Sequence, residues 1–124
     1  MSNTRQSFHE FKASRAAGQA RLMSVDHLGI KRFLRLDSAT YEDASAEGGL
    51  DPRTKELLGL VASAVLRCDD CINYHLEQCV KTGSTPKQIE DALNVALVVG
   101  GSIVIPHMRR ALLTLDEIVA ENPG

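Results

Sequence analysis

Two cysteines and a histidine lie close together in the middle of the chain, as Cys68, Cys71 and His75. Two thiols separated by two residues can join in a disulfide, and a helix that begins between them places Cys71 and His75 on one face. A thiolate can attack a peroxide oxygen or a disulfide sulfur, after which the second cysteine forms a disulfide with the first. An imidazole, with a pKa of about 6.5, suits the transfer of a thiol proton near neutral pH. The spacing predicts a redox site.

The same atoms allow a second chemistry, which is metal binding. One helical stripe would hold four possible zinc ligands, Cys68, Cys71, His75 and Cys79. Ligands from consecutive turns of one helix form a row, whereas a structural zinc ion needs a tetrahedron that a second segment usually completes. We therefore expect no metal or other cofactor here, and we expect Cys79 to lie in the hydrophobic core.

Composition and charge restrict the class of protein. The chain has 124 residues, of which 44% are hydrophobic and 24% charged, as is typical of one globular domain. Its formal net charge is -2, from 14 basic and 16 acidic residues. No excess of positive charge therefore marks nucleic acid or an anionic membrane as a partner. Aromatic residues are scarce, and Ala, Leu and Val supply the apolar content, which favours helices over strands.

Three features of the sequence predict the cellular location. No apolar run is long enough to span a bilayer, because polar and glycine residues interrupt the longest one, 92–105. The first residues lack the apolar core of a signal peptide. Three cysteines are an odd number for a disulfide scaffold, and a C-x-x-C pair in a reducing compartment is typical of catalysis or metal binding. We expect a cytoplasmic protein.

Helical periodicity and helix start signals divide the chain into six elements. Asp51 followed by proline marks one start, and Thr85 followed by proline, with Gln88 three residues on, forms a capping box at another. Helices are expected over about 5–22, 25–41, 52–67, 86–98 and 103–121. A further helix, capped by Asp69 or Asp70, is expected to run to about 82, with Gly83 as its left-handed stop. The sequence thus predicts an all-α helical bundle in a single domain, 1–124, with an N-terminal helix at 5–22 and a core of about 25–121.

The ionisation of Cys71 is left open by the sequence. Cys71 falls in the first turn of its helix, where free backbone N–H groups and the helix dipole stabilise a thiolate. Asp69 and Asp70 oppose this effect, because nearby negative charge favours the protonated thiol. The balance depends on the positions of these groups in space.

The motif C-x-x-C-x-x-x-H has an upstream glutamate, Glu56, with eleven residues between it and the first cysteine. A capped helix from Thr85 and a double glycine at 100–101 follow the motif. This combination resembles the carboxymuconolactone decarboxylase family, in particular its alkylhydroperoxidase D-like branch. The resemblance covers about residues 34–113.

The resemblance implies an all-helical protein that assembles into dimers, trimers or hexamers and reduces peroxides with thiols. By position, Cys71 matches the family's peroxide-reacting cysteine and Cys68 its disulfide partner. His75 and Glu56 match the proton relay that activates the thiol. The sequence departs from the pattern at Asp70, where well-studied members have a second histidine.

The proposed relay poses a geometric question. At about 1.5 Å per residue, Glu56 lies about 18 Å from Cys68 along its helix, whereas His75 lies about 10 Å along the next one. A simple side-by-side hairpin would leave the carboxylate and the imidazole apart. Contact would then require steeply crossing helices, a bridging water or another subunit.

Three functions remain open at this point. The first is a peroxide reductase or disulfide reductase that works with an unknown thiol reductant. The second is a lyase like the lactone decarboxylases of the same family, which generally lack the cysteine pair. The third is a helical assembly or metal-binding module without enzymatic activity.

The amount of apolar surface also predicts a homo-oligomer. The expected helix 52–67 is apolar around most of its circumference, and residues 93–105 are mostly apolar as well. This is more apolar surface than the chain's own helices can easily cover. The helix 52–67 is expected to be buried on several sides, and His107 is expected at a solvated helix end.

Overall fold

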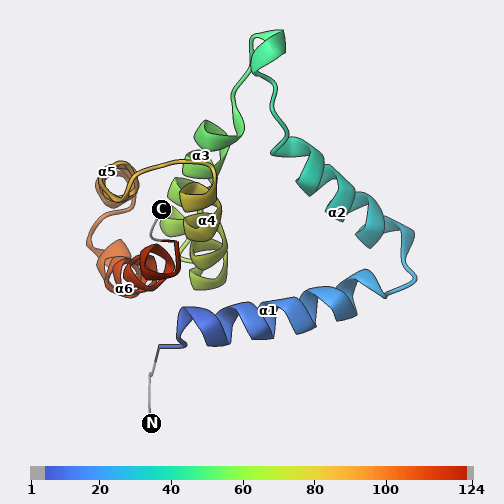
Figure 1. The fold of residues 1–124 in the computed structure, drawn as a ribbon, viewed down its shortest axis with the longest axis horizontal. Coiled ribbons are helices and arrows are strands. Elements are labelled where there is room, and N and C mark those ends of the chain that lie inside the picture. The colour runs from blue at the N-terminus through green and yellow to red at the C-terminus, as the bar shows by residue number, and fades with distance from the viewer. Residues whose placement is uncertain (1–4, 123–124) are drawn as a thin grey trace.

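The computed structural model describes residues 5–122 and is all-helical over that range, so the predicted fold class is confirmed (Figure 1). Residues 1–4 and 123–124, which the single-domain prediction included, lie outside the described part. The elements within residues 5–122 are α1 Phe8–Met23, α2 Leu28–Thr40, η1 Ser45–Glu47, α3 Pro52–Val65, α4 Asp69–Lys81, α5 Pro86–Gly100, η2 Ser102–Val104 and α6 Ile105–Glu121, where η marks a 3-10 turn. None of these helices is long and apolar enough to cross a membrane.

The predicted caps set the starts of two helices. The Asp51 carboxylate accepts the Thr54 backbone N–H at 2.8 Å at the start of α3. Thr85 and Gln88 form the predicted capping box at the start of α5. Each of these bonds satisfies a backbone group that the first turn of a helix would otherwise leave unpaired.

The other four helix starts differ from the prediction. α1 begins at Phe8 instead of about 5. α2 begins at Leu28 instead of 25, because the His27 ring accepts a backbone N–H of the first turn. α6 begins at Ile105, after the η2 turn has taken up the preceding residues. The cap of α4 is Cys68 itself, whose sulfur accepts the Cys71 backbone N–H at 3.4 Å, and neither aspartate takes this role.

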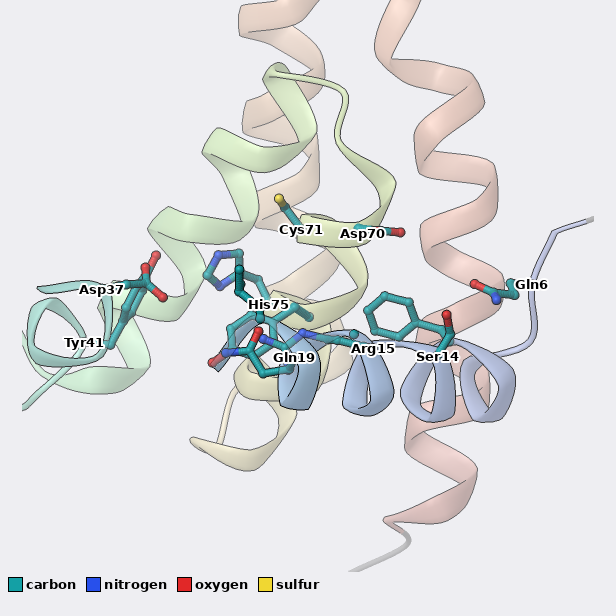
Figure 2. Close-up of a pocket in the computed structure, with 13 residues that line it drawn as sticks. Gln6, Ser14, Arg15, Gln19, Asp37, Tyr41, Asp70, Cys71 and His75 are labelled. Atoms are coloured by element: carbon teal, nitrogen blue, oxygen red, sulfur yellow. The ribbon is translucent and has the colours of Figure 1, made fainter. Parts of the chain in front are cut away.

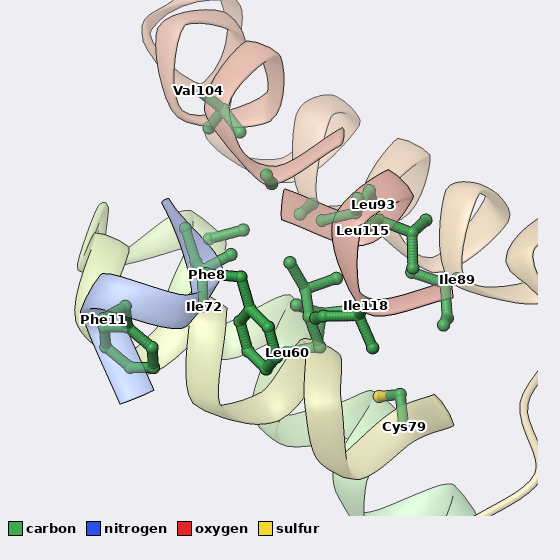
Figure 3. Close-up of a cluster of buried hydrophobic side chains, with 14 residues drawn as sticks. Phe8, Phe11, Leu60, Ile72, Cys79, Ile89, Leu93, Val104, Leu115 and Ile118 are labelled. Carbon is green, nitrogen blue, oxygen red and sulfur yellow. The ribbon is translucent and has the colours of Figure 1, made fainter. Parts of the chain in front are cut away.

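The core lies among α3, α4, α5 and α6. α3 packs against both α4 and α5, and α6 packs across α4. Figure 3 shows the apolar side chains of these helices meeting between the ribbons. The fully buried ones include Leu60, Ile72, Leu76, Cys79, Ile89, Leu93 and Ile118. Cys79 is therefore a core residue, as the sequence predicts.

The first two helices extend away from this bundle (Figure 1). The N-terminal half of α1 is tied to the bundle: Phe8 and Phe11 enter the core, and the Glu117 carboxylate of α6 accepts the Phe8 backbone N–H at 2.7 Å and pairs with Arg5. α2 has no buried side chain, and its Phe33 is 66% exposed.

The prediction that α3 is buried on several sides is wrong in part. Glu56, Leu60 and Ala64 face the bundle and are buried, but Leu58 and Leu66 are exposed. The helix contacts α4 and α5 only along part of its circumference, so its opposite side is left without a neighbour within the described chain.

Candidate active site

The two cysteines lie at the turn that joins α3 to α4. Arg67 adopts a left-handed conformation, with φ of 61°, just before Cys68 caps the next helix. Both thiols are free, and their sulfur atoms share a hydrogen bond at 2.8 Å. A disulfide bond needs about 2.05 Å between the sulfurs. The two sulfurs are therefore neighbours that an oxidant can join in a disulfide.

The Cys71 thiol holds its proton in this arrangement. The hydrogen bond with Cys68 and partial burial raise the pKa of Cys71 to about 11, and the negative charge of Asp70 acts in the same direction. The Arg15 guanidinium opposes them with a smaller effect. The net effect on the pKa is an increase, so these contributions are larger than the stabilisation of the thiolate by the helix N-terminus. The ionisation of Cys71, which the sequence left open, thus favours the protonated thiol. A base is therefore needed to make Cys71 a nucleophile near neutral pH.

The structure brings Glu56 and His75 together in the interior of the protein. His75 Nδ1 lies 2.8 Å from Glu56 Oε1, and the two residues are only 9% and 5% exposed. A carboxylate that holds Nδ1–H leaves Nε2 as the nitrogen that can accept a proton, and it stabilises the resulting imidazolium. Glu56 is therefore a buried and paired carboxylate of α3, not a solvated one.

This contact forms within one chain and without a bridging water. Gly59, one turn after Glu56 on α3, lies directly against the imidazole. A Cβ atom at Gly59 would be 2.6 Å from His75 Cε1 and 2.8 Å from the Tyr41 hydroxyl oxygen. The absence of a side chain at Gly59 thus gives the His75 ring the space to lie against α3 and reach the carboxylate.

Replacing Gly59 by alanine is expected to displace the His75 ring and break its bond with Glu56. No real Cβ atom comes as close as 2.6 Å to another heavy atom, and both neighbours here are rings with little freedom to move. We expect a loss of about 1–3 kcal/mol in the free energy of unfolding, the usual cost of overpacking. Denaturant unfolding followed by circular dichroism measures this loss.

Gly18→Ala is a matched control for that substitution. Gly18 lies within α1, and a Cβ there would have no heavy atom within 4 Å. Alanine should stabilise this helix by about 0.5–1 kcal/mol, because glycine costs that much in a helix interior. Equal effects of the two substitutions would contradict the role assigned to Gly59.

A cleft of about 450 Å³ leads from solvent to Cys71 and His75. α4 forms one wall, and α1 forms the opposite one, which includes the polar residues Ser14, Arg15 and Gln19 (Figure 2). Tyr41, which follows α2, closes the end of the cleft beside His75. The lining residues are Gln6, Phe11, Ser14, Arg15, Gly18, Gln19, Leu22, Asp37, Tyr41, Asp70, Cys71, Tyr74 and His75. Glu56 and Cys68 are not among them, so Cys71 is the sulfur that faces this space.

The four possible zinc ligands of the helical stripe are not gathered at one point. Cys79 lies in the core, where burial raises its pKa to about 12. Within residues 5–122, no group of three or more His, Cys, Asp or Glu side chains is placed to hold a metal ion.

Several contacts near the site had no sequence signal. The Asp69 carboxylate, beside the cap residue, lies 2.7 Å from His107 Nδ1 and accepts a hydrogen bond from Arg110 Nε at 2.8 Å, which ties the cysteine turn to α6. The expectation that His107 lies at a solvated helix end is therefore wrong. Gly59 and Tyr41 were also missed, because their role depends on contacts between separate helices that no local pattern encodes.

Residues 31–114 match a family model described as the carboxymuconolactone decarboxylase family. Among curated proteins, "uncharacterized protein 4 in cox locus" of Paracoccus denitrificans is 34% identical over 109 residues, which are 86% of this chain and 91% of that protein. The alkyl hydroperoxide reductase AhpD of Corynebacterium aurimucosum is 26% identical over 106 residues. These cover 80% of this chain but 60% of AhpD.

Solved structures show the same fold. A carboxymuconolactone decarboxylase family protein from Thermotoga maritima, for which a part in the antioxidative response has been suggested, is 50% identical, with a TM-score of 0.81. The match covers 91% of this chain and 94% of that protein. A family protein from Legionella pneumophila has a TM-score of 0.79 at 23% identity, over 90% and 96% of the two chains, and supports the fold alone.

Proposed function

Because the chain belongs to the carboxymuconolactone decarboxylase family, we propose that it is a thiol-dependent peroxide reductase that uses Cys68 and Cys71 as its redox pair. The observation that carries this proposal is that Cys71, whose thiol neighbours the free thiol of Cys68, lines the same cleft wall as His75, whose imidazole is paired with the buried Glu56 carboxylate. The cysteines supply a nucleophile and a partner for a disulfide. The pair of Glu56 and His75 supplies the base that the high pKa of Cys71 demands.

The proposed reaction begins with proton transfer from the Cys71 thiol to His75. The thiolate sulfur then attacks one peroxide oxygen, so that an S–O bond forms while the O–O bond breaks, and an alcohol or water leaves. Cys68 attacks the resulting sulfenic acid, forming the disulfide and releasing water. The two cysteines lose two electrons and the peroxide gains them, so turnover requires two thiol equivalents from a reductant to restore the cysteines.

Two relatives support this chemistry. The Corynebacterium protein is named an alkyl hydroperoxide reductase. The half-identical Thermotoga protein has been suggested to take part in the antioxidative response. The proposal extends peroxide reduction to this chain because it combines the thiol pair, the pair of Glu56 and His75, and a cleft that leads to Cys71.

The experiment that tests the function is stopped-flow mixing of the reduced protein with hydrogen peroxide and with an organic hydroperoxide. Mass spectrometry then locates any disulfide. Rapid formation of a bond between Cys68 and Cys71 is expected. Thiols that stay reduced over minutes would contradict peroxide reduction and favour a disulfide reductase.

A lyase activity like that of the lactone decarboxylases is the alternative within the family. Such an activity would not need the cysteine pair. Lyase turnover that survives replacement of both Cys68 and Cys71 by serine would favour it over the redox function.

We also propose that the protein is a homo-oligomer. Val98, Val99 and Ile103 form an exposed apolar surface on α5 and η2, and Val98 is 77% exposed. Surfaces of this kind on a small domain are typical of contacts between chains.

Val98→Glu is expected to shift the molar mass measured by light scattering toward that of one chain, whereas Lys87→Glu, at the other end of the same helix, is expected to leave it unchanged. A single-chain mass for the wild type would contradict the proposal.

A further inference from the structure

We propose that Tyr41 is a further catalytic residue, which donates its hydroxyl proton to the oxygen that leaves the peroxide. This inference rests on the proposed peroxide reductase function and assigns it a proton donor. The thiol, the imidazole and the carboxylate account for making the nucleophile. They leave open how the departing alkoxide or hydroxide is neutralised.

The position of Tyr41 places its hydroxyl beside the relay. Tyr41 lines the same cleft as Cys71 and His75, and its ring centroid lies 5.5 Å from that of the His75 imidazole (Figure 2). The Tyr41 hydroxyl oxygen and His75 Cε1 both lie within 3 Å of the point where a Cβ at Gly59 would sit. The phenol oxygen and the imidazole are therefore close neighbours at the inner end of the cleft.

The backbone at Tyr41 is held in place from both sides. Lys55 Nζ donates to the Thr40 carbonyl at 2.7 Å and to the Glu42 carbonyl at 2.6 Å. These are the residues immediately before and after Tyr41, and Lys55 lies next to Glu56 on α3. One ammonium group thus fixes the tyrosine to the helix that carries the relay carboxylate, although the rest of α2 has no buried side chain.

The ionisation of Tyr41 suits a proton donor. Burial raises the pKa of Tyr41, and the negative charges of Glu56 and Asp37 raise it further. The phenol therefore stays protonated at neutral pH. Among residues 5–122, no group is hydrogen-bonded to its hydroxyl, so the proton is available to a molecule in the cleft.

The second tyrosine of the cleft is placed differently. The face of the Tyr74 ring is covered by the Arg15 guanidinium, at 4.3 Å from the ring centroid, and its edge meets the His75 ring. Tyr74 is therefore a matched control, because its replacement also removes a phenol hydroxyl from the cleft.

The step balances with the groups present. His75 takes the Cys71 proton, and the thiolate sulfur forms a bond with one peroxide oxygen while the O–O bond breaks. The leaving oxygen departs with the electron pair and takes the Tyr41 proton, which gives an alcohol. The imidazolium of His75 then returns a proton to the Tyr41 phenolate, so the net reaction converts a thiol and a hydroperoxide into a sulfenic acid and an alcohol.

The test compares two oxidants that differ in their need for a proton donor. tert-Butyl hydroperoxide releases an alkoxide that must be protonated, whereas peracetic acid releases acetate, which leaves without a proton at neutral pH. Tyr41→Phe keeps the ring against His75 and removes only the hydroxyl. Stopped-flow rate constants for sulfenic acid formation should fall about 100-fold with the alkyl hydroperoxide and no more than about threefold with the peracid, since general acid catalysis contributes at least about 100-fold where it operates.

Two results would overturn the assignment of Tyr41. One is an equal loss with both oxidants, or no loss, in a Tyr41→Phe protein whose circular dichroism matches the wild type. The other is the same oxidant-selective loss in Tyr74→Phe, for which the wild-type ratio of the two rates is expected. A wild-type protein that reacts with neither oxidant would instead refute the peroxide reductase function itself, and the Tyr41 step with it.

Discussion

Cys71→Ser is expected to abolish peroxide reduction, whereas Cys68→Ala is expected to reduce one equivalent of peroxide and then stop. Cys71 is the sulfur that faces the cleft, on the same wall as His75. Without it the cleft holds no nucleophile for the peroxide. Without Cys68 the sulfenic acid forms but has no partner for a disulfide. Single-turnover kinetics, with dimedone trapping of sulfenic acid and intact-mass analysis, separate the two outcomes.

The same pair of variants tests the ionisation of the site. The hydrogen bond with Cys68 is the largest cause of the raised pKa of Cys71, about 11. A raised pKa means that the thiolate fraction is small at pH 7 and grows as the pH rises toward 11, so the wild-type rate should increase over that window, by up to about tenfold per pH unit. Cys68→Ala should lower the pKa of Cys71 and therefore raise the rate of the first oxidation at pH 7. Fast sulfenic acid formation on Cys68 in Cys71→Ser would reverse the two assignments.

Glu56→Gln is expected to slow thiol oxidation by about 10²-fold near pH 7, in the range that general base catalysis contributes. Glutamine keeps a hydrogen-bonding group within reach of His75 Nδ1, but it cannot stabilise the imidazolium that forms when His75 takes the thiol proton. Glu56→Gln should therefore fold as the wild type does. Glu56→Ala should in addition lower the free energy of unfolding by about 1–3 kcal/mol, because the buried Nδ1 group loses its partner.

Glu77→Gln provides the matched control. Glu77 is a carboxylate of α4 that pairs with Lys12 at 2.9 Å and does not line the cleft. Like Glu56→Gln, Glu77→Gln removes one negative charge, but it does so on α4, the helix that carries Cys71 and His75. The oxidation rate should stay at the wild-type level in Glu77→Gln, and a wild-type rate in Glu56→Gln would show that the carboxylate takes no part in the relay.

The sequence by itself determined the fold class and the approximate extent of each helix. Local signals suffice for these features: the apolar period of each helix, the starts at Asp51 and Thr85, each followed by proline, and the left-handed glycine at Gly83, which has φ of 99°. The motif around Cys68 and Cys71, with Glu56 upstream, also indicated the family, which the family-model match confirms. All of these depend on residues within a few turns of one another or on a fixed spacing along the chain.

Only the tertiary structure decided how the candidate site is assembled. The contact between Glu56 and His75 depends on the space left by Gly59, and the position of Tyr41 depends on Lys55 from another helix. The balance of effects on Cys71 depends on the distance between two sulfur atoms and on burial. Hydrogen bonds, desolvation and charge interactions depend on positions in space and not on spacing along the chain. The sequence therefore supplies the thiol, imidazole, carboxylate and phenol groups, whereas the packing of α2, α3 and α4 sets their pKa values and the distances between them.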